Sequence, residues 1–219
     1  MFKGLFSWWK EDILLKSALD QSAHAIETAG RMFSLAMAVV TSGTGNEKIV
    51  YDMDKELNSG QIDIRKKVLE HLAVRPAQDV TSSLVLITVI IDIERVGDLA
   101  KNLVEVFQIN HGVLTKPAYS QDIEAMQEKL ENSFTAVREA FTGCSEAKAV
   151  RVMDDCTWVS NRCDIILQGV AGDEDLLVRE AVAYTLLFRH LKRISGHIRN
   201  VASSVVNPFH KLGYKPDRD

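Results

Sequence analysis

The chain has 219 residues, of which 46% are apolar and 26% charged, with a formal net charge of −4. This composition is typical of a globular protein and excludes an intrinsically disordered chain. The longest apolar run, Leu84 to Ile91, is far shorter than the roughly 20 residues of a membrane-spanning helix. Acidic and basic residues are spread over both halves, which argues against a nucleic-acid-binding domain.

The N-terminal residues 1–10 form an aromatic tail whose apolar core is too short for a signal peptide. Its composition suits the membrane interface or a partner's groove, or a cap on the rest of the protein. The three cysteines lack the CxxC spacing of a zinc or redox site and predict reduced thiols. We therefore expect a cytoplasmic protein.

Glycine and proline gather in clusters, and long segments with few of either lie between them. Because these residues mark helix ends and turns, they predict six helices. The predicted helices cover residues 11–41, 46–74, 77–110, 119–142, 145–169 and 174–206. In the second and fourth, apolar residues recur at helical spacing, which predicts one buried face for each.

The third predicted helix contains the β-branched run Leu84 to Ile91, which would pass locally for a strand. We predict helix, because the run continues without a breaker into a charged stretch and no strand partner exists elsewhere in the sequence. A helix that is apolar on nearly all sides belongs in the middle of a bundle.

The two halves of the sequence show a weak internal repeat. Residues 84–106 align with residues 182–204, so that Arg95 meets Arg193 and the last predicted helices of the two halves correspond. The repeat predicts an all-α fold of two tandem antiparallel three-helix bundles. The bundles would cover residues 11–111 and 119–207, and a polar, frayed C-terminal tail would follow at 208–219.

Three acidic residues, Asp92, Glu94 and Asp98, lie within seven positions of the third predicted helix. Glu94 and Asp98 are four residues apart on one helix face, where like charges repel by roughly 0.2–0.5 kcal/mol. Ion pairs with Arg95 and Lys101 could offset this repulsion at the surface. The alternative is a hard cation held by carboxylate and amide oxygens.

The second predicted helix offers two more pairs at a spacing of four, Asp52 with Glu56 and Asp54 with Asn58. If the second and third helices are antiparallel neighbours, these oxygens can converge on those of the third helix. Two adjacent oxygen pairs are what a multinuclear metal site needs. The alternative is a solvated helix face, because Lys55 and Arg65 to Lys67 provide partners within the helix.

The sequence contains no nucleophile–base set, no Gly-rich phosphate loop and no HExxH motif, so we predict that the protein is not an enzyme. A metal-dependent hydrolase that uses the oxygens of Asp54, Glu94 and Asp98 is the alternative, although no general base is visible. Gly97 and Gly196 stand alone inside predicted helices, and we interpret them as positions of close packing.

The stretch Glu94-Arg95-Val96-Gly97-Asp98, which continues to Asn102, resembles the motif of the PhoU family of phosphate-uptake regulators. The segment YDMDKELN of the second helix resembles that family's acidic partner segment. The resemblance extends over about residues 11–207 and includes the two-bundle repeat.

The resemblance implies a cytoplasmic negative regulator of inorganic phosphate uptake. Such a protein contacts the ATPase of the phosphate ABC transporter and the sensor histidine kinase of the phosphate two-component system. It approaches the membrane only through these partners, and a homodimer is plausible. The alternative is an accessory protein of a sodium/phosphate or Pit-type carrier. A plain helical scaffold with an acidic surface is a third possibility.

The resemblance also implies a divalent or multinuclear metal with oxygen ligands, such as iron, manganese, magnesium or calcium. Carried over by position, the ligands are Glu94 and Asp98, with Asp54 and Asn102. Helical phase adds three further candidates, Asp52, Glu56 and Asn58.

The second copy of the motif departs from the family, because it reads Lys192-Arg193-Ile194-Ser195-Gly196 and both ligand positions are lost. The surrounding residues form a basic face that should repel a metal cation. This face suits an anion such as phosphate or an acidic partner, and it consists of Arg189, Lys192, Arg193 and Arg199. The alternative is a solvated stripe that pairs with Asp154, Asp155 and Glu180.

Overall fold

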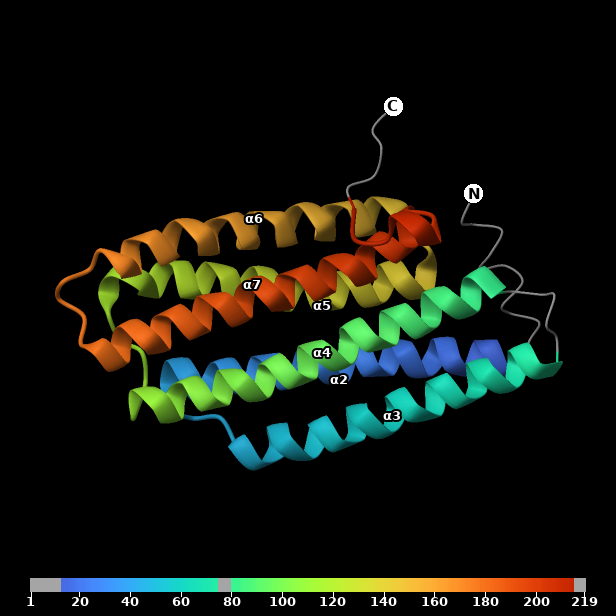
Figure 1. Ribbon diagram of the computed structural model, residues 1–219, viewed down its shortest axis with the longest axis horizontal. Helices are drawn as coiled ribbons and strands as arrows, with labels where there is room; N and C mark the ends of the chain where they lie inside the picture. The colour runs from blue at the N-terminus through green and yellow to red at the C-terminus, as the bar shows by residue number, and fades with distance from the viewer. Residues whose placement is uncertain (1–12, 75–79, 215–219) are drawn as a thin grey trace.

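The computed structural model describes residues 13–74 and 80–214, which form six α-helices and one short 3₁₀-helix (Figure 1). This part of the chain contains no strand. The helices are α2 (Ile13–Ser42), α3 (Glu47–Val74), α4 (Val80–Asn110), α5 (Pro117–Gly143), α6 (Glu146–Ala171) and α7 (Val178–Val206), followed by η1 (Phe209–Lys211). The predicted all-α class and the six helices are confirmed, and the run Leu84 to Ile91 lies within α4.

Among the helices that do not begin next to undescribed residues, two start more than one residue away from the prediction, for local reasons. Helix α5 begins at Pro117 and not at 119, because a proline in the first turn lacks an N–H that the helix would leave unbonded. Helix α7 begins at Val178 and not at 174. The Glu180 carboxylate caps this start by accepting a hydrogen bond from the Leu177 N–H at 2.9 Å. Upstream of it, Asp173 accepts a hydrogen bond from Lys116 at 2.7 Å, which fixes the loop before α7.

Helices α2, α3 and α4 pack into one bundle, and α5, α6 and α7 pack into a second. Between the bundles, α4 packs against α7 and α2 packs against α5 (Figure 1). These are corresponding helices of the repeat, so the two halves meet as the two subunits of a twofold dimer do. Helix α4 is buried on several sides, as its apolar sequence predicts, because it contacts both its own bundle and α7.

Hydrogen bonds fix the C-terminal end of the described chain, so the prediction of a frayed tail is wrong as far as Tyr214. The amide of Asn207 donates to the carbonyls of Lys211 and Tyr214 at 3.1 and 2.7 Å. The Gly213 N–H donates to Ser203 Oγ at 2.7 Å. The aromatic tail predicted for residues 1–10 lies outside the described residues. No helix in the described ranges is both long and apolar enough to cross a membrane.

Candidate acidic site and bundle interface

Helices α3 and α4 approach each other closely at Gly97. A Cβ atom at this position would lie 2.8 Å from Leu57 Cδ1 and 3.7 Å from Asp54 Oδ1. The interpretation of Gly97 as a close-packing residue is therefore confirmed. The same interpretation of Gly196 is wrong, because a Cβ atom there would meet nothing within 4 Å.

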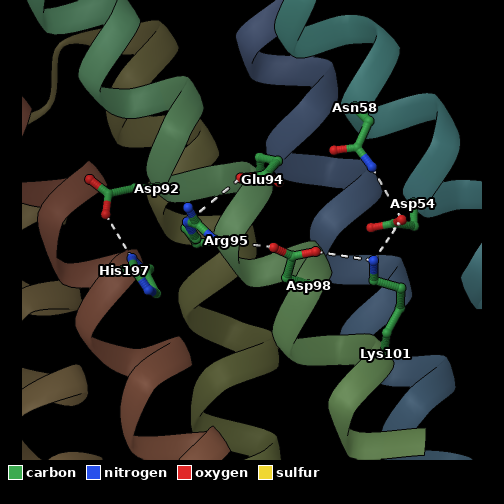
Figure 2. A network of polar contacts seen from close by, with 8 residues as sticks. All are labelled: Asp54, Asn58, Asp92, Glu94, Arg95, Asp98, Lys101 and His197. Atoms are coloured by element: carbon green, nitrogen blue, oxygen red, sulfur yellow. Dashed lines mark hydrogen bonds and ion pairs between the residues drawn. The ribbon is translucent and has the colours of Figure 1, made fainter.

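Next to Gly97, a continuous chain of polar contacts links α3 with α4 (Figure 2). Lys101 Nζ lies 2.8 Å from Asp54 Oδ2 on α3 and 3.0 Å from Asp98 Oδ1 on its own helix. The Asn58 amide donates to the same Asp54 Oδ2 atom at 3.2 Å. Arg95 lies further out, 3.4 Å from Asp98 Oδ2. The ammonium group of Lys101 thus lies between two carboxylates from neighbouring helices.

The electrostatics of this cluster favour a cation at the position of Lys101. Burial alone would lower the pKa of Lys101, but hydrogen bonds to Asp54 and Asp98 outweigh it and raise that pKa. Burial, followed by the negative charge of Asp98, raises the pKa of Glu94 above its ordinary value. Since the folded chain binds this proton more tightly than the unfolded chain, ionising Glu94 reduces stability as the pH rises through its folded pKa.

The structure brings together only some of the predicted metal ligands. Asp54, Asn58 and Asp98 belong to the cluster around Lys101, and Glu94 lies beside it with its side chain only 16% exposed. Asn102 lines an adjacent cavity.

Two predicted ligands point elsewhere. Asp52 is exposed and pairs with Lys55 at 2.9 Å, as the alternative interpretation expected. Glu56 faces α2, where it lies 3.3 Å from His24 Nε2. Their spacing along α3 explains this, because residues two apart on a helix point in nearly opposite directions, so Asp52 and Asp54 cannot both face α4.

As placed, the acidic residues do not fit a metal ion. In the described part of the chain, no three histidine, cysteine, aspartate or glutamate side chains converge closely enough to hold one. Lys101 supplies the positive charge between Asp54 and Asp98, and a metal ion could bind these oxygens only after the ammonium group moved away. Metal binding stays a prediction, conditional on that movement.

A second polar contact, which the sequence did not predict, joins the two bundles. The buried Asp92 carboxylate on α4 lies 2.7 Å from His197 Nδ1 on α7 (Figure 2). It also accepts a hydrogen bond at 3.0 Å from Asn200 Nδ2, on the same helix. The sequence did contain a signal for this contact, because an aspartate that is buried on an apolar helix needs a polar partner. The sequence could not say which distant residues supply it.

The four predicted anion-binding residues are spread over different environments. Lys192 forms an ion pair with Asp164 on α6 at 2.5 Å. Arg199 is partly buried, and its Nε atom forms no hydrogen bond within the described ranges. Arg189 and Arg193 are exposed, and Arg193 lines the same cavity as Asn102. The four therefore do not share one continuous surface pocket.

Two of the acidic residues named as partners for this face have other contacts. Asp155 pairs with Lys129 at 2.7 Å, and Glu180 caps the start of α7. The pairing of Lys192 with Asp164 nevertheless supports the general idea that acidic side chains of α6 neutralise part of the basic face.

The family model of the PhoU domain matches residues 23–107. The crystal structure of PhoU from Pseudomonas aeruginosa superposes with a TM-score of 0.79 at 17% identity, and the match covers 88% of this chain and 95% of that one. The phosphate transport system regulatory protein PhoU from Streptococcus pneumoniae gives 0.72 at 17% identity, covering 92% and 95%. The search among curated proteins gave no match.

These comparisons confirm the resemblance to the PhoU family. The family model covers α4 with its acidic motif, together with α3 and most of α2. The structural matches extend the fold similarity over both bundles.

Proposed function

With a PhoU domain in its first half and the PhoU fold over nearly its whole length, we propose that this chain is a negative regulator of inorganic phosphate uptake. It acts in the cytoplasm by binding the ATPase of a phosphate ABC transporter and the sensor histidine kinase of the phosphate two-component system. The observation that carries the proposal is the PhoU-domain match, which includes the complete first-half motif from Glu94 to Asn102.

The geometry of the acidic site supports a binding protein and not a hydrolase. Asp54 and Asp98 are both in contact with the Lys101 ammonium group, which keeps them ion-paired. A general base must reach the proton of its substrate, and these carboxylates already contact the Lys101 ammonium group.

Deleting the gene in its own organism tests the regulatory role. We expect phosphate uptake to remain high in phosphate-rich medium, because the transporter and the kinase are no longer restrained. Uptake is measured with radiolabelled phosphate, and the intact gene on a plasmid should restore repression. Unchanged uptake in the deletion strain would contradict the proposal. Capture of a sodium/phosphate or Pit-type carrier by the purified chain, without the ABC transporter ATPase, would favour the accessory-protein alternative.

A divalent metal ion is the further part of this proposal, and it depends on Lys101. We expect Lys101→Met to bind Mn²⁺ at least about tenfold more tightly than the unchanged chain, because a competing positive charge is removed from the Asp54–Asp98 pair. Isothermal titration calorimetry measures the affinity. Adding Asp98→Asn to the variant should remove the gain.

Lys55→Met is the matched control, since Lys55 also pairs with an aspartate but at the exposed surface. It should leave Mn²⁺ affinity unchanged. If neither the unchanged chain nor Lys101→Met binds Mn²⁺, the metal prediction is wrong.

A further inference from the structure

A cavity of about 390 Å³ opens beside the acidic site, where α3, α4 and α7 meet. Its size is at the lower end of the roughly 300–1,000 Å³ that small-molecule sites occupy. Polar and charged side chains from all three helices line it, among them Tyr51, Arg95, Asn102, Glu105 and Arg193. The cavity therefore touches both bundles.

Two arginines, Arg95 of α4 and Arg193 of α7, face this cavity from opposite bundles. The Arg95 side chain is 54% exposed and makes only long contacts, 3.4 Å to Asp98 and 3.9 Å to Glu94. Asp98 is closer to Lys101, at 3.0 Å. Arg95 is therefore weakly held and can turn toward a ligand.

Arg193 is exposed and forms no ion pair with any carboxylate of the described ranges. Its positive charge acts on its surroundings, because burial and the charge of Arg193 lower the pKa of His190 to about 4. Two guanidinium groups that line one cavity repel each other unless an anion lies between them. The cavity thus has an end that attracts negative charge.

The two carboxylates of the cavity offset this attraction only in part, because three cationic side chains, Arg95, Lys101 and Arg193, line it against Asp98 and Glu105. Lys101 lies 3.0 Å from Asp98, although it also contacts Asp54. Glu105 is ten residues after Arg95 on α4, which corresponds to about 15 Å along the helix axis. Asn102 lies between them, two turns after Arg95, and its amide can donate a hydrogen bond to an anion.

We propose that this cavity binds a phosphate group, either as inorganic phosphate or on a small organic ester, between Arg95 and Arg193. The planar guanidinium group matches phosphate oxygens with two parallel hydrogen bonds. Because the arginines come from different bundles, the bound group links the two halves of the chain. The site requires neither a metal ion nor a partner protein, so it stands apart from the regulatory role proposed above.

Binding of two probes to the purified full-length chain tests the site, namely inorganic phosphate and glycerol 3-phosphate at constant ionic strength. We expect at least one probe to bind, and Arg193→Gln to weaken that binding at least about tenfold, because a charge-assisted contact is lost. Arg95→Gln should weaken it similarly. Binding of the ester alone would identify an ester ligand, and tighter binding of phosphate would identify the free ion.

The matched control is Arg189→Gln, an exposed arginine one turn earlier on α7. It removes the same charge but should change the affinity less than about twofold, since it does not line the cavity. Two results would overturn the site. One is no binding of either probe at millimolar concentration, and the other is an equal loss in Arg189→Gln and Arg193→Gln.

Discussion

Replacing Asp92 by alanine is expected to lower the free energy of unfolding by about 2–3 kcal/mol, because two partly buried donors lose their acceptor. His197 and Asn200 both contact Asp92 Oδ1, and they come from the opposite bundle. In a protein of this size the loss corresponds to a melting temperature about 4–12 °C lower. Thermal unfolding followed by circular dichroism measures it.

Asp52→Ala is the matched control for this variant. Asp52 is 54% exposed and pairs with Lys55 at the surface, so its removal should change stability by less than about 1 kcal/mol. Asp92→Asn preserves the volume and one acceptor and should fall between the two. If Asp92→Ala were as stable as Asp52→Ala, the contact between the bundles would contribute nothing to the fold.

Valine in place of Gly97 is expected to destabilise the chain by about 2–3 kcal/mol, because the added atoms overpack a buried helix contact. Its Cβ atom would lie 2.8 Å from Leu57 Cδ1, and Leu57 is itself only 3% exposed. The side chain of Leu57 must therefore move within a closely packed contact. Urea denaturation measures the loss.

Gly196→Ala, at the other isolated helix glycine, is expected to have the opposite effect on stability. A Cβ atom there meets nothing within 4 Å, so alanine should raise stability by about 0.5–1 kcal/mol through its better helix propensity. Comparing the two variants separates the effect of side-chain packing on stability from the effect of helix propensity. A Gly97→Val chain that unfolds at the same urea concentration as the unchanged chain would contradict the prediction and show that the Leu57 side chain shifts aside without loss of stability.

The helices could be predicted from local information. Breakers marked their ends, and the apolar run Leu84 to Ile91 was assigned correctly because no strand could pair with it. The starts of α5 and α7 were missed by a few residues, since they depend on the first-turn position of Pro117 and on the cap by Glu180.

The candidate site was only partly predictable. The positions of Asp52 and Asp54 along the helix could have shown that only one of them faces α4, because residues two apart point in nearly opposite directions. The sequence named Lys101 as a partner for Asp98 within its own helix. It could not show that Lys101 also contacts Asp54, 47 positions earlier, because that contact depends on how α3 packs against α4.

The packing of corresponding helices against each other has a consequence for how the two halves diverged. In a true homodimer every contact across the axis occurs twice, so a residue cannot change on one side alone. Here the repeat aligns Asp92 with His190, and the aspartate contact with α7 has no acidic counterpart in the other half. Because both halves belong to one polypeptide, their sequences need not be identical. The first half could keep its acidic motif while the second acquired arginine and lysine.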